Sequence, residues 1–72
     1  MTNTTLLETY FDKSGYKKSY IANALGITRS ALFLKTTNKN EFKASEIEAL
    51  CKLLNIGIAD RIRIFFANEV DL

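Results

Sequence analysis

The sequence contains no histidine, no proline and no tryptophan, and its single cysteine is Cys51. Without histidine, the usual general base of nucleophilic triads and the commonest zinc ligand are both missing. One cysteine forms neither an internal disulfide nor a zinc finger, and it fits a reducing compartment. Because a glycine-rich phosphate loop and a convincing carboxylate pair are also missing, we expect no enzyme activity, no cofactor and no metal.

Long hydrophobic runs are equally absent. No apolar stretch approaches the ~18 residues that suggest a membrane span. The first residues, MTNTTLLETYF, contain neither a basic segment nor a long apolar one, so a signal peptide is not expected. These absences predict a cytoplasmic protein with no membrane partner.

The length of 72 residues predicts a single domain over 1–72. A domain of this size buries only ~60% of the surface of its unfolded chain, so an apolar residue left outside the core is worth noticing. The net charge of +2 is unevenly distributed: residues 1–40 hold six basic and two acidic side chains, and residues 41–72 hold four basic and six acidic ones. The first half therefore faces a polyanion or an acidic protein, or else is an ordinary solvated surface.

The hydrophobic periodicity is helical along the whole chain, and no alternating β-strand pattern of useful length occurs. Short breaks divide the chain into five segments, which predicts an all-α, compact five-helix bundle. The polar loop at 37–43 contains Phe42, which we expect to anchor it in the core. The first predicted helix ends at Gly15, and the others lie at about 18–25, 29–36, 44–54 and 59–68.

Capping residues set the expected helix ends. Thr5 and Glu8 have the spacing of a capping box, and Ser45 repeats that spacing before the fourth helix. Thr28 is a suitable N-cap for the third helix. Gly15 is a natural stop for the first helix, and Gly26 follows the second helix in the same way.

Apolar stripes identify the inward faces of the last two helices. Ile47, Leu50, Cys51 and Leu54 form the stripe of the fourth helix, on which Cys51 is expected to be a small buried hydrophobe. Ile62, Phe65 and Phe66 share one face of the fifth helix. Core packing explains this face more simply than a dimer contact does.

The second and third segments are joined by only a few residues around a glycine, which is the spacing of a helix-turn-helix at about residues 18–36. Ala22 is small enough for the next helix to cross over it. Gly26 can adopt a positive φ in the turn, and Leu32 reaches the core from the second helix of the pair. The stretch KKSYIANALGITRSALF meets all three requirements.

On the segments IANALGITRSAL and EFKASEIEALCKLLNI, the chain resembles the Cro/CI-type helix-turn-helix domains of temperate phages, the lambda-repressor-like DNA-binding domains. The resemblance covers about residues 4–66. It implies a regulator of the switch between lysogeny and lytic growth in the cytoplasm of a bacterial host cell. The short length and the unusual third helix are most similar to the antirepressors, which bind the lysogeny repressor rather than simply competing for its operators.

The resemblance also implies roles for individual residues. DNA contacts in that family come from the start of the second helix, from the outward face of the third, or recognition, helix, and from the loop after it. In this sequence these positions are Lys18, then Arg29, Ser30 and Leu34, and finally Asn38, Lys39 and Asn40.

Leu34 departs from the pattern of a DNA-reading helix. With inward-pointing Leu32 at zero and about 100° per residue, Ser30 lies near ~160° and Leu34 near ~200°, away from the core. Base edges are read mainly through paired hydrogen bonds, and a leucine offers only a contact to a thymine methyl group. An isolated exposed leucine with no role is nevertheless normal.

Phe33 lies on the flank of the same helix, near ~100°. It either folds back over Tyr16 or Tyr20 and extends the core, or faces a partner. In the second case Ile27, Phe33 and Leu34 would form the apolar cluster that the centre of a protein interface requires.

Two functions follow from these residues. In the first, an antirepressor binds the N-terminal DNA-binding domain of a CI-type repressor through its recognition helix and blocks operator binding. Leu34 and Phe33 would form the apolar centre of the contact, and Lys18, Arg29 and Lys35 its charged rim. Lys17 and Lys18 would meet phosphates, acidic side chains or only solvent.

In the second function, a Cro-like repressor binds operator DNA directly, alone or in a complex with the repressor. Such a protein normally needs a dimer to span two half-sites. We expect the free chain to be a monomer rather than a dimer, because no long segment follows the fifth helix in the sequence given.

Overall fold

The computed structural model describes residues 1–66, and every regular element within this range is an α-helix. The prediction of five helices is confirmed, although the last helix ends at Phe65, before the expected end at residue 68, which lies outside the described residues. The helices are α1 (Thr4–Ser14), α2 (Lys18–Ala24), α3 (Arg29–Thr36), α4 (Ala44–Leu54) and α5 (Ile58–Phe65). No helix in this range has the length and apolar character to cross a membrane.

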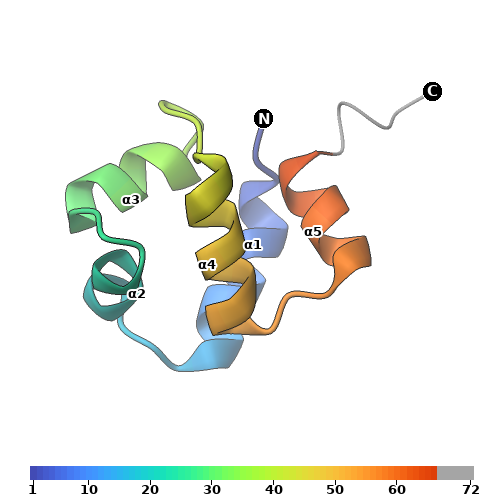
Figure 1. Cartoon of the computed structure of the whole chain (residues 1–72), viewed down its shortest axis with the longest axis horizontal. Helices are drawn as coiled ribbons and strands as arrows, with labels where there is room; N and C mark the ends of the chain where they lie inside the picture. Colours follow the sequence, from blue (N-terminus) through green and yellow to red (C-terminus); the bar gives the residue numbers. More distant parts are fainter. Residues whose placement is uncertain (67–72) are drawn as a thin grey trace.

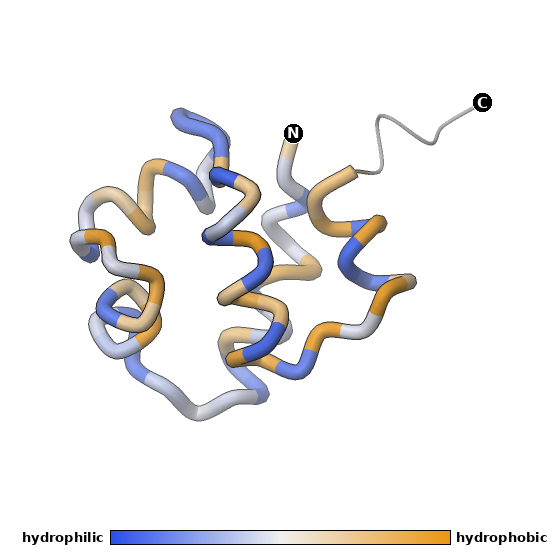
Figure 2. The backbone as a smooth tube through the Cα atoms, in the orientation of Figure 1, coloured by the Kyte–Doolittle hydropathy of each residue, from blue (hydrophilic) through white to orange (hydrophobic). Residues whose placement is uncertain are grey.

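Helix α4 occupies the middle of the molecule (Figure 1). Helices α2 and α3 lie on one side of it, α5 lies on the other, and α1 crosses behind. Direct packing contacts join α4 to α1 and α2, and α1 to α5. The hydropathy pattern in Figure 2 agrees with this arrangement, because the turn between α3 and α4 is hydrophilic whereas hydrophobic residues recur along α4.

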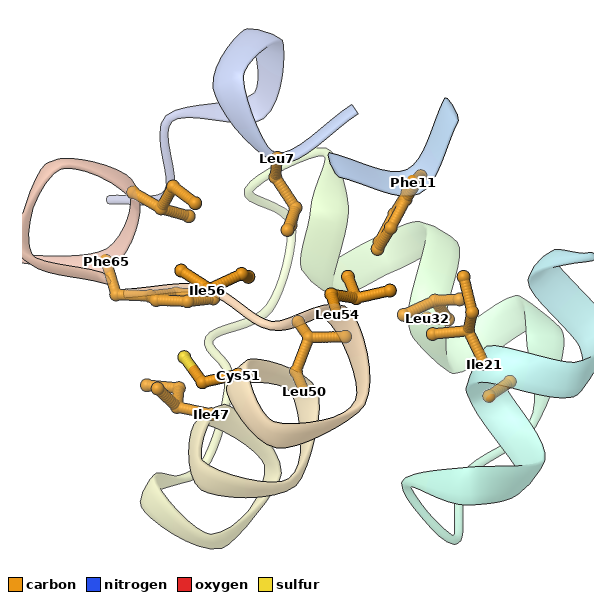
Figure 3. Close-up of a cluster of buried hydrophobic side chains, with 12 residues drawn as sticks. Leu7, Phe11, Ile21, Leu32, Ile47, Leu50, Cys51, Leu54, Ile56 and Phe65 are labelled. Carbon is orange, nitrogen blue, oxygen red and sulfur yellow. The ribbon is translucent and has the colours of Figure 1, made fainter. Parts of the chain in front are cut away.

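The core is built around the apolar stripe of α4, as predicted. Leu50 is fully buried and Leu54 nearly so, and Figure 3 shows them between Ile21 on one side and Phe65 on the other. Phe42 packs against this core from the loop and meets the ring of Phe65 edge-on at 5.5 Å. The expected anchor of the loop is therefore confirmed.

A residue in the left-handed backbone conformation follows each of the first four helices. Gly15 has φ 71° after α1, and Gly26 has φ 73° after α2, as their positions predict. Asn38 and Asn55 take the same conformation after α3 and α4, with φ values of 66° and 59°. Asparagine tolerates this region better than most residues, because its short polar side chain bonds locally.

Both predicted capping boxes are wrong. Helix α1 begins one residue before Thr5, because the side chain of Asn3 accepts a hydrogen bond from the Leu6 amide at 3.1 Å. At α4 the backbone amide of Lys43 donates to Glu46 at 2.9 Å, so Ser45 is inside the first turn and does not cap it. Thr28 does cap α3, since its hydroxyl accepts from the Ala31 amide at 3.0 Å.

The inward face of α5 is turned from the predicted one. Ile64 and Phe65 are buried, whereas Ile62 is 37% exposed, and Phe66 is only partly buried. The reason is the contact with α1. The Tyr10 hydroxyl donates to Asp60, and Ile64 lies one turn after Asp60 on the same side of α5.

Candidate interaction surface on helix α3

Helix α3 is held in place by a short turn and by packing against α2. The amide of Ile27 donates to the carbonyl of Ala22 at 3.0 Å, while Gly26 takes positive φ between them. Ala22 and Leu32 are each only 1% exposed. The three positions singled out in the sequence therefore have the expected environments, and the side of α3 opposite Leu32 is left facing outward.

The outward side of α3 presents two adjacent apolar residues. Phe33 is 63% exposed and Leu34 is 37% exposed. Phe33, which lies on the flank, is thus more exposed than Leu34, which the helical geometry places opposite the core. The rings of Tyr16 and Tyr20 pack on each other with 4.9 Å between their centres. The alternative in which Phe33 folds back over them to extend the core is not observed.

The other residues predicted to lie on the outward surface of α3 differ in their solvent exposure. Arg29 and Ser30 are exposed beside Phe33 at the start of α3. Ile27 is half-buried and packs against the core, so it contributes only part of its side chain to this surface. We call the exposed set Arg29, Ser30, Phe33 and Leu34 the α3 face.

Phe33 lines two hollows. One is a shallow depression, largely open to solvent, which is lined by the four residues of the α3 face and has a volume of about 410 Å³. The other has a volume of about 290 Å³ and is lined by residues of α3 and by the facing residues Glu8 and Lys18. Arg29 and Phe33 line both, so the two adjoin at these side chains.

The basic side chains around the α3 face differ in whether an acidic side chain pairs with them. Lys18 forms an ion pair with Glu8 at 3.2 Å, and its ammonium lies 5.8 Å from the centre of the Phe11 ring. Lys17 is exposed at the N-cap position of α2. Arg29 is exposed and has no ion-pair partner among residues 1–66. Arg29 is thus the basic group of this face whose charge is left uncompensated in that range.

The expectation that Lys35 lies on the exposed rim is wrong. Its ammonium lies 2.5 Å from the Glu46 carboxylate, and the two side chains are only 10% and 8% exposed. Burial acts to raise the pKa of Glu46, but the hydrogen bonds from Lys35 and from the Lys43 amide outweigh it, and the pKa is lowered. A signal was present in the sequence: at about 100° per residue, Lys35 lies only ~60° from inward-pointing Leu32.

The three residues predicted to contact phosphate in the loop after α3 differ in whether their side chains are available. Asn38 accepts from the Thr2 amide at 2.6 Å and donates to the Thr2 carbonyl at 3.0 Å. Its amide group is therefore occupied in holding the N-terminal segment. Lys39 and Asn40 are exposed, and their backbone amides donate to the carbonyl of Leu34 at 2.9 and 3.1 Å.

Sequence reasoning missed the role of Glu8. This carboxylate reaches from α1 to Lys18 and so places a negative charge at the edge of a surface expected to be basic. The two residues are ten positions apart and on different helices, and nothing in their local pattern indicates the pairing.

Comparisons of the chain with protein-family models, with curated proteins and with solved structures found no match.

Proposed function

We propose that α2 and α3 act as a helix-turn-helix unit, and that the protein is an antirepressor of a phage lysogeny switch. The α3 face binds the DNA-binding domain of a CI-type repressor and prevents that domain from reaching its operator. The observation that carries the proposal is the exposure of Phe33 and Leu34 side by side, at 63% and 37%, on the outward side of α3.

The energetic argument rests on the cost of leaving apolar groups in water. Fully burying a leucine or phenylalanine side chain contributes roughly 1.5–3 kcal/mol, and a domain of this size has little apolar surface to spare. Aromatic side chains at the centre of a protein interface often carry much of the binding free energy. A protein partner that covers Phe33 and Leu34 would recover the stabilisation that the free chain forgoes.

The α3 face is poorly suited to reading bases. Arg29 and Ser30 supply its polar side chains, and Phe33 and Leu34 occupy the rest. Each well-formed pair of hydrogen bonds to a base contributes about 1–3 kcal/mol of discrimination, and two apolar residues supply none of it. This composition favours a protein partner over operator DNA.

Direct binding to operator DNA is the second candidate function. It is favoured by exposed basic side chains around the α3 face, namely Lys17, Lys18, Arg29 and Lys39. Phosphate contacts by these residues would give binding with a strong salt dependence and little sequence preference. A complex of this chain and a repressor on one operator would combine both functions.

The test uses the purified chain and the DNA-binding domain of a CI-type repressor encoded in the same genome. Fluorescence anisotropy of a labelled operator duplex reports whether the chain releases the repressor. We expect release, and we expect Leu34→Asp to weaken it by at least about 30-fold, which corresponds to ~2 kcal/mol at an interface centre.

Ile58→Asp is the matched control, because Ile58 is an exposed apolar residue on α5 and is 80% exposed. It should compete with operator as the unchanged chain does. Normal repressor release by Leu34→Asp would refute the proposed contact. A nanomolar, sequence-specific shift of the operator by the chain alone at physiological salt would favour the second candidate instead.

A further inference from the structure

The hollow between Phe33 and the ion pair of Glu8 and Lys18 has an apolar floor. Leu32 lies at its base and is almost completely buried, and the Phe33 ring forms one wall. Two threonines complete the α3 side. Their hydroxyls donate to α3 carbonyls, Thr36 to Leu32 and Thr37 to Phe33, each at 2.8 Å. Since these donors are already used, this side of the hollow offers few polar contacts to an occupant. We call this hollow the Phe33 slot.

One of the positive charges at the edge of the Phe33 slot has no ion-pair partner among residues 1–66. Glu8 and Lys18 lie 3.2 Å apart and compensate each other. Arg29 lines the same hollow without an ion-pair partner in residues 1–66. The slot therefore combines an apolar interior with a single uncompensated cation at its edge.

We propose that the Phe33 slot receives an apolar side chain of the partner that stands next to a carboxylate. The apolar side chain enters between Phe33 and the α1–α2 side, and the carboxylate meets the Arg29 guanidinium. The volume of about 290 Å³ lies at the lower limit of ligand pockets, so the slot suits one side chain rather than a cofactor. This proposal rests on the proposed function for the partner's identity, but the chemistry of the occupant follows from the slot itself.

Small probes test the slot without a partner protein. Hexanoate carries an apolar chain and a carboxylate, hexylamine carries the same chain and a cation, and hexanol is neutral. Titrations of the ¹⁵N-labelled chain, followed by NMR, should shift the amide signals of Phe33, Thr36 and Thr37. Hexanoate should bind about two- to fivefold more tightly than hexylamine, the preference that an exposed ion pair supplies.

Two variants separate the apolar and the charged contributions. Arg29→Gln should remove the preference for hexanoate while hexanol still binds. Phe33→Ala should weaken all three probes, because it removes the wall that the alkyl chain contacts. Arg63→Gln is the matched control, since Arg63 is an exposed arginine on α5 that pairs with Asp60, and it should leave all three titrations unchanged.

Equal binding of hexanoate and hexylamine, an Arg29→Gln variant that keeps the preference, or shifts confined to residues outside the slot would each overturn the inference. These outcomes are distinguishable from failure of the proposed function. If hexanoate binds the slot but no CI-type repressor binds the chain, the slot stands and the antirepressor proposal fails. If the repressor binds through Leu34 but hexanoate does not enter the slot, the reverse holds.

Discussion

Lys35 of α3 and Glu46 of α4 form a buried ion pair, with 2.5 Å between Nζ and Oε1. The same carboxylate oxygen accepts the backbone amide of Lys43 at the start of α4. One carboxylate thus joins the helix that carries the α3 face to the first turn of the central helix. Because the pair lies only ~60° from the core direction of α3, it sets which side of α3 can point outward.

Removing one partner of this pair should destabilise the domain. Lys35→Met leaves the Glu46 carboxylate without its cation, and we expect a loss of about 3 kcal/mol in the free energy of unfolding, at the lower end of values for buried pairs. Urea denaturation followed by circular dichroism measures it. Lys52→Met, which removes the 78% exposed partner of Glu48, should cost less than about 0.5 kcal/mol. Equal losses would show that the Lys35–Glu46 pair contributes no more to stability than an exposed ion pair does.

The same pair should give the domain an acid-sensitive component of stability. The pKa of Glu46 is lowered from its ordinary value of 4.5 in the folded state, so its contribution is complete above that value. It is lost as the pH falls through the folded-state pKa, because the unfolded chain then binds the proton more readily. Unfolding midpoints in urea between neutral pH and pH 3 should therefore fall less steeply for Glu46→Gln than for the unchanged chain.

Asp60 contributes to the acid slope as well, because hydrogen bonds from Tyr10 and Arg63 lower its pKa. The comparison with Glu46→Gln isolates the Glu46 part, since the Asp60 contacts are on α1 and α5 and remain in that variant. An unchanged slope in Glu46→Gln would contradict a contribution of Glu46 to the acid sensitivity.

Two glycines allow a matched test of the turn before α3. Gly26 has φ 73°, and a Cβ built there meets no atom within 4 Å, so Gly26→Ala should cost only the backbone penalty of ~1–2 kcal/mol. Gly57 is the N-cap of α5, with φ −74° and equally open surroundings. Alanine is a poorer N-cap but loses less conformational entropy on folding, so the two effects oppose each other and Gly57→Ala should change the free energy of unfolding by no more than about 0.5 kcal/mol. Thermal unfolding of both variants checks the difference, and similar melting temperatures would contradict it.

Adjacent residues on α3 should behave oppositely. Leu32→Ala should lower the free energy of unfolding by about 2–5 kcal/mol, because it empties a fully buried position. Phe33→Ala should change it by less than about 0.5 kcal/mol, as expected for an exposed side chain away from the core. Chemical denaturation of both variants tests this. A large loss in Phe33→Ala would mean that the ring packs on the domain in solution.

The helices and their order are predictable from the sequence because hydrophobic periodicity and helix stops are local signals. The third helix is the clearest case: Thr28 caps it where the pattern predicts, and Leu32 lies in the core. The capping boxes at Thr5 and Ser45 were each wrong by two residues, because the N-caps are Asn3 and Lys43. Asn3 and Glu46 offered competing caps at nearby positions, and packing decides between such alternatives.

Contacts between helices distant in the sequence could not be predicted. The side of α5 that carries Ile64, which is buried in place of Ile62, also holds Asp60, whose hydrogen-bond partner Tyr10 is fifty residues away in the sequence. The exposure of Phe33 likewise depends on the neighbouring helices, because its position on the flank of α3 is compatible with either packing or exposure. For Lys35, helical geometry did indicate the core side, but its charge suggested the surface.

The hydrogen bonds of the N-terminal segment also constrain the timing of folding during synthesis. Asn3 donates its amide to the carbonyl of Ile64 at 2.7 Å, and Thr2 pairs with Asn38 across 36 residues. At about 5–20 residues per second, Ile64 is added roughly 3–12 s after Asn3. The hydrogen bond of Asn3 therefore cannot form until α5 has been made, whereas the bonds between Thr2 and Asn38 become possible as soon as the loop after α3 is complete.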